Sequence, residues 1–320
     1  MTEKRLRHVY GPVPSRRLGR SLGVDLVPFK TCSYDCIYCQ LGRTTEKTID
    51  RKVLIPVEDV LADLDEKLAG GVTPDVISLA GSGEPTLYAG LGELIRGIKA
   101  RTGIPVAVLT NGSLLWREDV RKDLSAADLV IPSLDAGDGR LFEYVNRPHP
   151  GLTFEQMTEG LVEFTSGFSG EVRLEVFLLD GVTSGDTEVK KIASWVERIR
   201  PARVELNTVT RPPGEDYAFP VGLDRMRNLA GFFPGRVDVI GGWTGKESAA
   251  GEAAGSGDED VLDLLRRRPC TKEDVAAGLG LHLTEAIKKL DRLDKAGKTK
   301  RSRVGSLVYY AAAEGDDLPR

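Results

Sequence analysis

The sequence predicts an α/β fold in which repeated strand and helix units form a barrel or an open doubly wound sheet, followed by a small separate domain. Short apolar runs rich in Val, Ile and Leu recur between residues 22 and 241, and longer amphipathic stretches separate them. A stretch of Gly, Ala, Ser and charged residues at 244–257 then precedes a segment with a different pattern.

The apolar runs lack the polar alternation of strands that face water on one side. We therefore expect strands that are covered on both faces, as in a parallel sheet. The expected strands span 22–28, 75–81, 105–110, 128–135, 172–180, 203–209 and 236–241. The expected helices include 57–69, 153–166 and 186–199, with Thr153 and Asp186 as N-caps. Folds of this kind place their sites at the carboxyl ends of the strands.

The chain divides into three parts. Residues 1–243 form the expected larger domain, 244–257 a flexible linker, and 258–313 a winged-helix-like domain. The last assignment rests on three short helical stretches, at 258–268, 272–281 and 283–298, and on a final hairpin over 301–312 with its turn at Gly305.

Composition excludes a protein that is basic throughout and coats nucleic acid, because 44 Lys and Arg against 48 Asp and Glu leave a net charge of −4. The chain shows no signal peptide and no run of about 18 apolar residues, so we expect a soluble, cytoplasmic protein with no membrane partner.

One segment, 285–303, is locally basic, with eight bases and three acids. Two interpretations stay open: a surface for nucleic acid or peptide, or a solvated face balanced by the acidic helix before it. The bases are Lys288, Lys289, Arg292, Lys295, Lys298, Lys300, Arg301 and Arg303.

Three of the four cysteines lie within eight residues, as Cys32, Cys36 and Cys39, whereas Cys270 stands far away. A disulfide framework needs an even, dispersed set in a small secreted chain. The clustered thiols of this large chain indicate a metal site instead.

Several metal sites compete for this spacing. A structural zinc ion would need a fourth ligand from His8, His149 or Cys270, which are all distant in sequence. A ferredoxin-type cluster would need four cysteines, and no fourth lies nearby. A third alternative is a buried structural trio of thiols that holds no metal. The spacing favours a [4Fe–4S] cluster held by three thiolates, with one iron open to a non-protein ligand.

The loop CSYDCIYC (32–39) resembles the CxxxCxφC signature of the radical S-adenosylmethionine (SAM) superfamily, and Tyr38 fills the aromatic position φ. The resemblance implies a partial (β/α)6 TIM-like barrel and a [4Fe–4S] cluster on Cys32, Cys36 and Cys39. It also implies that SAM chelates the open iron and is reductively cleaved to a 5′-deoxyadenosyl radical, with a reductant such as flavodoxin or ferredoxin.

Three further motifs follow successive strands, and the resemblance implies SAM contacts for each. Gly83 and Glu84 in GSGEPTL (81–87) would receive the SAM amino group, and Asn111 in TNGSLL would help bind cofactor or substrate. Ser133 and Asp135 in PSLDA (132–136) would meet the ribose hydroxyls. Taken alone, each segment is also an ordinary turn or helix cap.

A narrower resemblance covers most of the first 240 residues. The segments 10–26, 145–156 and 206–215 are similar to the radical SAM group that includes wyosine-base (tRNA) synthases. Those enzymes carry a second set of cysteines upstream, and this chain has no cysteine before Cys32. The chain therefore fits better among the uncharacterised relatives in that group.

The substrate contacts have weaker support. Basic residues before the first strand, before the cysteine loop and in two later loops are candidates for phosphate or carboxylate binding, or are simply solvated. They are Arg16, Arg17, Arg20, Lys30, Arg147 and Arg211.

Two functions follow. The first is a radical SAM enzyme acting on an unidentified substrate, such as RNA or a peptide. The alternative is a regulatory DNA-binding protein whose labile iron–sulfur cluster controls the C-terminal domain, which would leave GSGEPTL and PSLDA without a role.

Overall fold

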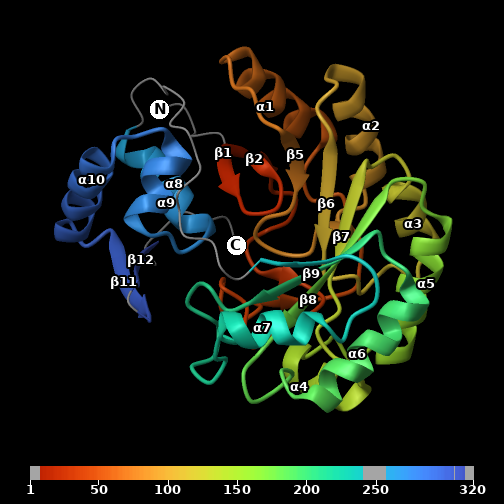
Figure 1. Cartoon of the computed structure of the whole chain (residues 1–320). Coiled ribbons are helices and arrows are strands. Elements are labelled where there is room, and N and C mark those ends of the chain that lie inside the picture. The colour runs from red at the N-terminus through yellow and green to blue at the C-terminus, as the bar shows by residue number, and fades with distance from the viewer. Residues whose placement is uncertain (1–7, 241–256, 306, 314–320) are drawn as a thin grey trace.

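The computed structural model of the chain describes residues 8–240, 257–305 and 307–313 (Figure 1). The linker predicted at 244–257 lies outside these residues except for Gly257. The strands of the larger domain are β1 (Val9–Ser15), β2 (Gly19–Val24), β3 (Thr31–Cys32), β4 (Glu46–Lys47), β5 (Val76–Leu79), β6 (Val106–Thr110), β7 (Leu129–Pro132), β8 (Glu171–Leu178), β9 (Arg203–Thr208) and β10 (Val237–Val239).

The helices of the larger domain are α1 (Val57–Ala69), α2 (Leu91–Arg101), α3 (Glu118–Leu124), α4 (Gly139–Asn146), α5 (Phe154–Gly167), α6 (Asp186–Ile199) and α7 (Leu223–Ala230), with a short 3-10 helix, η1 (Pro85–Leu87). The C-terminal domain contains α8 (Asp258–Arg267), α9 (Lys272–Leu279), α10 (Leu283–Lys295), β11 (Thr299–Val304) and β12 (Leu307–Ala312).

In the described part of the chain, the larger domain is built on one eight-stranded sheet with the order β1-β2-β5-β6-β7-β8-β9-β10. All neighbouring strands run parallel except β1 and β2, which form an antiparallel hairpin. Helices α1, α2, α3, α5 and α6 follow the outside of the sheet (Figure 1). No pairing between described residues joins β1 to β10. The predicted α/β fold, a partial barrel, is confirmed.

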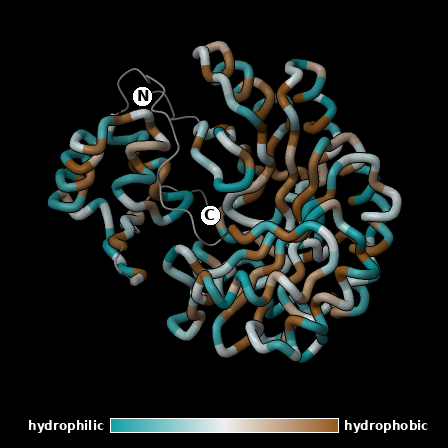
Figure 2. Tube along the Cα trace, in the orientation of Figure 1, coloured by the Kyte–Doolittle hydropathy of each residue, from teal (hydrophilic) through white to brown (hydrophobic). Residues whose placement is uncertain are grey.

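The outer face of the sheet carries the main hydrophobic core. Ile77, Val108 and Leu174 are fully buried there in one cluster with side chains of the surrounding helices, and hydrophobic stretches follow the central strands (Figure 2). Each such side chain contributes roughly 1.5–3 kcal/mol on burial. No described helix is both long and apolar enough to cross a membrane.

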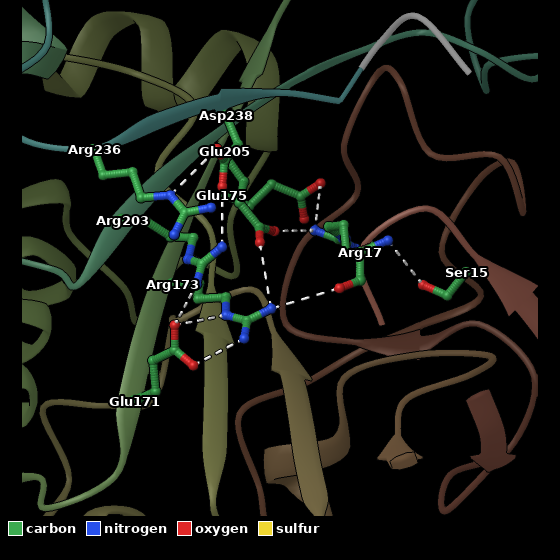
Figure 3. A network of polar contacts seen from close by, with 9 residues as sticks. All are labelled: Ser15, Arg17, Glu171, Arg173, Glu175, Arg203, Glu205, Arg236 and Asp238. Carbon is green, nitrogen blue, oxygen red and sulfur yellow. Dashed lines mark hydrogen bonds and ion pairs between the residues drawn. The ribbon is translucent and has the colours of Figure 1, made fainter. Parts of the chain in front are cut away.

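The inner face of the sheet is apolar on β5, β6 and β7 and charged on β8 and β9. The turn between β1 and β2 contacts both parts. Leu18 of this turn packs against the apolar cluster on β5, β6 and β7. Its neighbour Arg17 reaches the opposite strands, where its Nη1 lies 3.0 Å from Glu175 Oε1 and 3.5 Å from Glu205 Oε2 (Figure 3). The turn therefore joins the two sides of the barrel.

The charged side extends along β8, β9 and β10 as a network (Figure 3). Arg173 and Arg203 both pair with Glu171, and Arg203 also pairs with Asp238. Burial opposes ionisation of Glu175, yet the adjacent Arg17 holds its pKa below the usual value. The ion pairs thus keep a carboxylate ionised inside the barrel.

The C-terminal domain packs against the hairpin. Its three helices and two-stranded sheet follow in the order that the sequence predicts, with the turn at Gly305, and its winged-helix character stays a prediction. Val13 of β1 belongs to its hydrophobic core, and the Arg267 guanidinium lies 4.5 Å from the Tyr10 ring centroid. From β12, the Tyr309 hydroxyl donates to the Thr210 carbonyl oxygen at 2.5 Å.

The predicted strands are all present with shifted ends, whereas β1 was not predicted. Gly11, Pro12 and Pro14 interrupt its sequence, and proline fits a strand only at a sheet edge, which is where β1 lies. Thr153 caps α5 as predicted. The prediction for Asp186 is wrong, because Gly185 is the N-cap of α6 and Asp186 is its first residue.

We expect Arg17→Ala to lower the free energy of unfolding by about 3 kcal/mol, because it leaves the half-buried Glu175 carboxylate without its ion-pair partner and the buried Glu205 with only Arg173, at 3.9 Å. Urea denaturation at neutral pH measures this loss. The matched control is Arg20→Ala in the same hairpin, where an exposed side chain should cost about 1 kcal/mol or less. Equal effects of the two substitutions would contradict this assignment.

Candidate functional site

The cysteine loop lies at the carboxyl end of the barrel, between the short strands β3 and β4. Cys32 ends β3, while Cys36 and Cys39 lie in the turns that follow. Between them, Ile37 is fully buried against Val145 and Leu179 and anchors the loop to the barrel. All three cysteine residues are half-buried and form no disulfide.

Two amides donate to the cysteine sulfurs. Asn111 Nδ2 lies 3.5 Å from Cys32 Sγ, and Asn146 Nδ2 lies 3.5 Å from Cys36 Sγ. Asn111 comes from the end of β6 and Asn146 from the end of α4. Donors to sulfur favour the thiolate and the reduced state of a bound cluster.

The thiols fit a cluster better than a single ion. Among the described residues, no three His, Cys, Asp or Glu side chains are close enough to bind one metal ion. Burial and the nearby Glu84 raise the pKa of Cys32 to about 12, and burial and Asp135 raise that of Cys36. A polynuclear cluster takes each thiolate on a different iron, and its positive charge would offset the cost of ionising these thiols.

The loop 81–84 lies directly against the strand that leads to Cys32. Lys30 N donates to Ser82 O at 2.6 Å, and Glu84 N donates to Thr31 O at 3.1 Å. A Cβ atom on Gly83 would lie 2.0 Å from Thr31 O, so only glycine allows this approach. Gly83 therefore sets the distance between the loop and the cysteines.

The Glu84 side chain joins the loop to the end of β6. Its Oε1 accepts from Thr86 N and from the hydroxyls of Thr86 and Thr110, and its Oε2 accepts from Asn111 N at 2.7 Å. Burial raises its pKa. Since a carboxylate oxygen has two lone pairs, Oε2 retains capacity for the ammonium of SAM.

The end of β7 supplies a second buried carboxylate. Asp135 Oδ2 accepts from the Tyr38 hydroxyl at 2.5 Å and from Asn146 Nδ2 at 2.8 Å, and Oδ1 accepts from Phe177 N at 3.2 Å. The Tyr38 and Phe177 rings stack with centroids 4.0 Å apart. Ser133 lies two residues earlier, in a bridge with Glu175 of β8. Tyr38 thereby connects the cysteine loop to β7 and β8.

The weaker candidates separate into two groups. The Arg17 and Arg147 guanidiniums are held by carboxylates, Arg17 inside the barrel and Arg147 by Glu215 at 2.6 Å. Lys30, Arg16 and Arg211 have no ion pair with a described carboxylate. The loop 211–215 lies on the cysteine loop, since Glu215 N donates to Ile37 O at 2.9 Å.

Sequence reasoning missed Asn146 and Asp25. Asn146 ends a helix, where an amide is unremarkable, yet it is 2% exposed and bonds both Cys36 and Asp135. Asp25 follows β2 and accepts from the Ser82 backbone N–H and hydroxyl, which fixes loop 81–84. The only sequence signal for Asp25 was its place at the carboxyl end of a strand.

Residues 26–195 match the family model of the radical SAM superfamily. The chain is 34% identical to a UPF0026 protein of Methanocaldococcus jannaschii, with 94% of each chain covered. It is 38% identical to a protein of Brachyspira hyodysenteriae named GTPase Obg, over 95% of this chain but only 45% of that protein. A radical SAM methyltransferase structure from Sphaerobacter thermophilus superposes with a TM-score of 0.54 at 17% identity, covering 68% of this chain and 65% of its own, which shows a shared fold.

The chain therefore belongs to the radical SAM superfamily and, within it, to the UPF0026 proteins. It is an enzyme of a class that uses a [4Fe–4S] cluster and SAM. The narrower resemblance to wyosine-base synthases stays a prediction.

Asp135→Asn tests the buried carboxylate. Burial raises the pKa of Asp135 from 3.8 to about 6, so between these values the folded protein holds a proton that the unfolded chain releases. The free energy of unfolding should then fall by about 3 kcal/mol as pH rises through this window. We expect the variant to lack this component in urea denaturation of the metal-free protein from pH 4.5 to 7.5.

The exposed Asp216→Asn serves as the control and should reproduce the wild-type pH profile. Parallel profiles for Asp135→Asn and wild type would show that Asp135 is not protonated in this window.

Proposed function

We propose that this enzyme reductively cleaves SAM at a [4Fe–4S] cluster held by Cys32, Cys36 and Cys39, and that the resulting 5′-deoxyadenosyl radical abstracts hydrogen from a substrate. The observation that carries the proposal is the convergence of polar groups on the cysteine loop from several strand ends. Asn111 contacts Cys32, Asn146 contacts Cys36, and Asp135 binds Tyr38. Such convergence at the carboxyl ends of the strands is typical of a catalytic site in a barrel.

When bound, the cluster supplies the electron that cleaves the carbon–sulfur bond of SAM. The residues of the chain position and polarise the reactants. The amides of Asn111 and Asn146 donate to sulfur, and Glu84 Oε2 would accept from the SAM ammonium. Ser133 and Asp135 would accept from the ribose hydroxyls, while the Tyr38–Phe177 stack packs the cysteine loop against β8.

In this proposal the enzyme works in the cytoplasm, and a low-potential protein such as flavodoxin or ferredoxin supplies the electron. No contact among the described residues distinguishes flavodoxin from ferredoxin as the electron donor.

The alternative, an iron–sulfur regulator that binds DNA through 285–303, has less support. Arg292 pairs with Asp258 of α8, Lys295 with Asp291, and Arg301 with Asp294. These ion pairs engage three of the eight bases that DNA binding would need.

Anaerobic reconstitution with iron and sulfide, followed by dithionite and SAM, should yield 5′-deoxyadenosine, measured by chromatography. We expect Cys32→Ala, Cys36→Ala and Cys39→Ala to lose the cluster absorbance and at least about 100-fold of product formation, because each removes an iron ligand. Cys270→Ala is the matched control and should keep both, since Cys270 is buried in the C-terminal core. Absence of product from a protein with an intact cluster would contradict the proposal.

A further inference from the structure

Three arginines meet where the C-terminal domain packs against the barrel. Arg16 comes from the turn between β1 and β2, Arg211 from the loop after β9, and Arg268 from the end of α8. Burial, followed by the positive charges of Arg211 and Arg17, lowers the pKa of Arg16 to about 10. Burial and the charge of Arg268 lower the pKa of Arg211. Arg211 therefore lies close enough to both Arg16 and Arg268 for the charges to repel.

Several donors of this arginine cluster (Arg16, Arg211 and Arg268) have no acceptor. Arg211 Nε and both Nε and Nη2 of Arg268 are buried and lack a hydrogen-bond partner among the described residues. Arg211 keeps one bond, from Nη1 to Gln40 Oε1 at 3.4 Å. A buried donor without a partner costs free energy comparable to a lost hydrogen bond, so the arrangement indicates an acceptor that the described residues do not supply.

The described residues also leave most of the positive charge uncompensated. Asp274 is the acidic side chain that interacts with both Arg211 and Arg268, and one of its oxygens already accepts from Thr271 N at 3.0 Å as part of the α9 capping box. Arg16 binds neutral oxygens instead, Thr210 Oγ1 at 3.1 Å and Ile240 O at 3.4 Å. Three cations against one carboxylate leave a surplus of about two charges.

The nearby acids of the barrel do not remove this surplus. Glu175 raises the pKa of Arg16, but its ion pair is with Arg17, which also takes Glu205. Arg17 and these two carboxylates belong to the barrel network of Figure 3, in which four arginines face four carboxylates, so that network is balanced by itself.

We propose that the arginine cluster binds the phosphate of a phosphomonoester substrate, held between the barrel and the C-terminal domain. Guanidinium groups bind phosphate oxygens in a bidentate manner, and a phosphomonoester carries about −1.5 to −2 charges at pH 7. That charge matches the surplus, whereas a phosphodiester or a single carboxylate carries only one.

The position of the cluster links this phosphate to the chemistry. Arg211 is bonded to Gln40, the residue after Cys39, and loop 211–215 lies on the cysteine loop. That the phosphate belongs to the substrate of the enzyme rests on the proposed function. The C-terminal domain, through Arg268 and the Tyr309 bond to Thr210, would then complete the substrate site.

The test measures binding to the full-length protein in phosphate-free buffer by calorimetry and thermal unfolding, at constant ionic strength. The probes are inorganic phosphate and glycerol phosphate, with dimethyl phosphate and succinate as comparators. We expect the first two to bind and to raise the melting temperature, and to bind more tightly at pH 7.5 than at pH 5.5 because the dianion forms near pH 6. Equal binding of dimethyl phosphate, or of succinate, would overturn the assignment.

Arg211→Gln and Arg268→Gln should each weaken phosphate binding by about tenfold or more. Without phosphate their melting temperatures should equal or exceed that of wild type, because a buried, unpaired cation is removed. Arg211→Lys should bind with intermediate affinity. The matched control is Arg266→Gln in the same helix, whose guanidinium pairs with Glu259 and Asp263 and which should bind phosphate as wild type does.

Unchanged phosphate affinity in both glutamine variants would refute the site, and so would a lowered melting temperature without phosphate, which marks a purely structural role. These measurements need neither SAM nor a reductant. A protein that binds phosphate but forms no 5′-deoxyadenosine would contradict the proposed function alone, and the reverse result would contradict the phosphate site alone.

Discussion

The structure depends on how an open barrel fills its interior. Among the described residues, the sheet has unpaired edges at β1 and β10. Without a segment that fills the interior, the charged inner face of β8 and β9 would lie opposite the apolar inner face of β5, β6 and β7. The turn between β1 and β2 fills this interior with two adjacent residues. Leu18 packs against the apolar strands, and Arg17 pairs with Glu175 and Glu205. Because removal of one partner from a buried ion pair is costly, this contact holds the hairpin in one position.

The hairpin position in turn determines how the two domains meet. Val13 of β1 completes the core of the C-terminal domain, and Arg16 precedes the half-buried Arg17. The same turn therefore fills the barrel, supports the second domain and brings a cation to the boundary between them. In the sequence this turn is simply a basic stretch, yet its adjacent residues Arg16, Arg17 and Leu18 each make a different kind of contact.

At the other end of the barrel, close backbone packing positions the chemistry. Gly83 lets loop 81–84 approach the strand before Cys32, and Asp25 fixes that loop through Ser82. Side-chain amides then reach the sulfurs from β6 and α4. The thiols are thus held by neighbours from several strands, which is how a barrel obtains a precise site from flexible loops.

The sequence by itself determined the class of fold, the apolar parallel strands and the cluster of three cysteines, because continuous apolar runs and residue spacing are local properties. Only the tertiary structure decided the partners of the charged residues. Arg147 and Arg17 are ion-paired, whereas Arg16 and Arg211 form no ion pair with a described carboxylate, although all four are simply arginines in loops or turns. Asn146 gained its role in the same way, since contacts between residues over 100 positions apart leave no pattern in a single sequence.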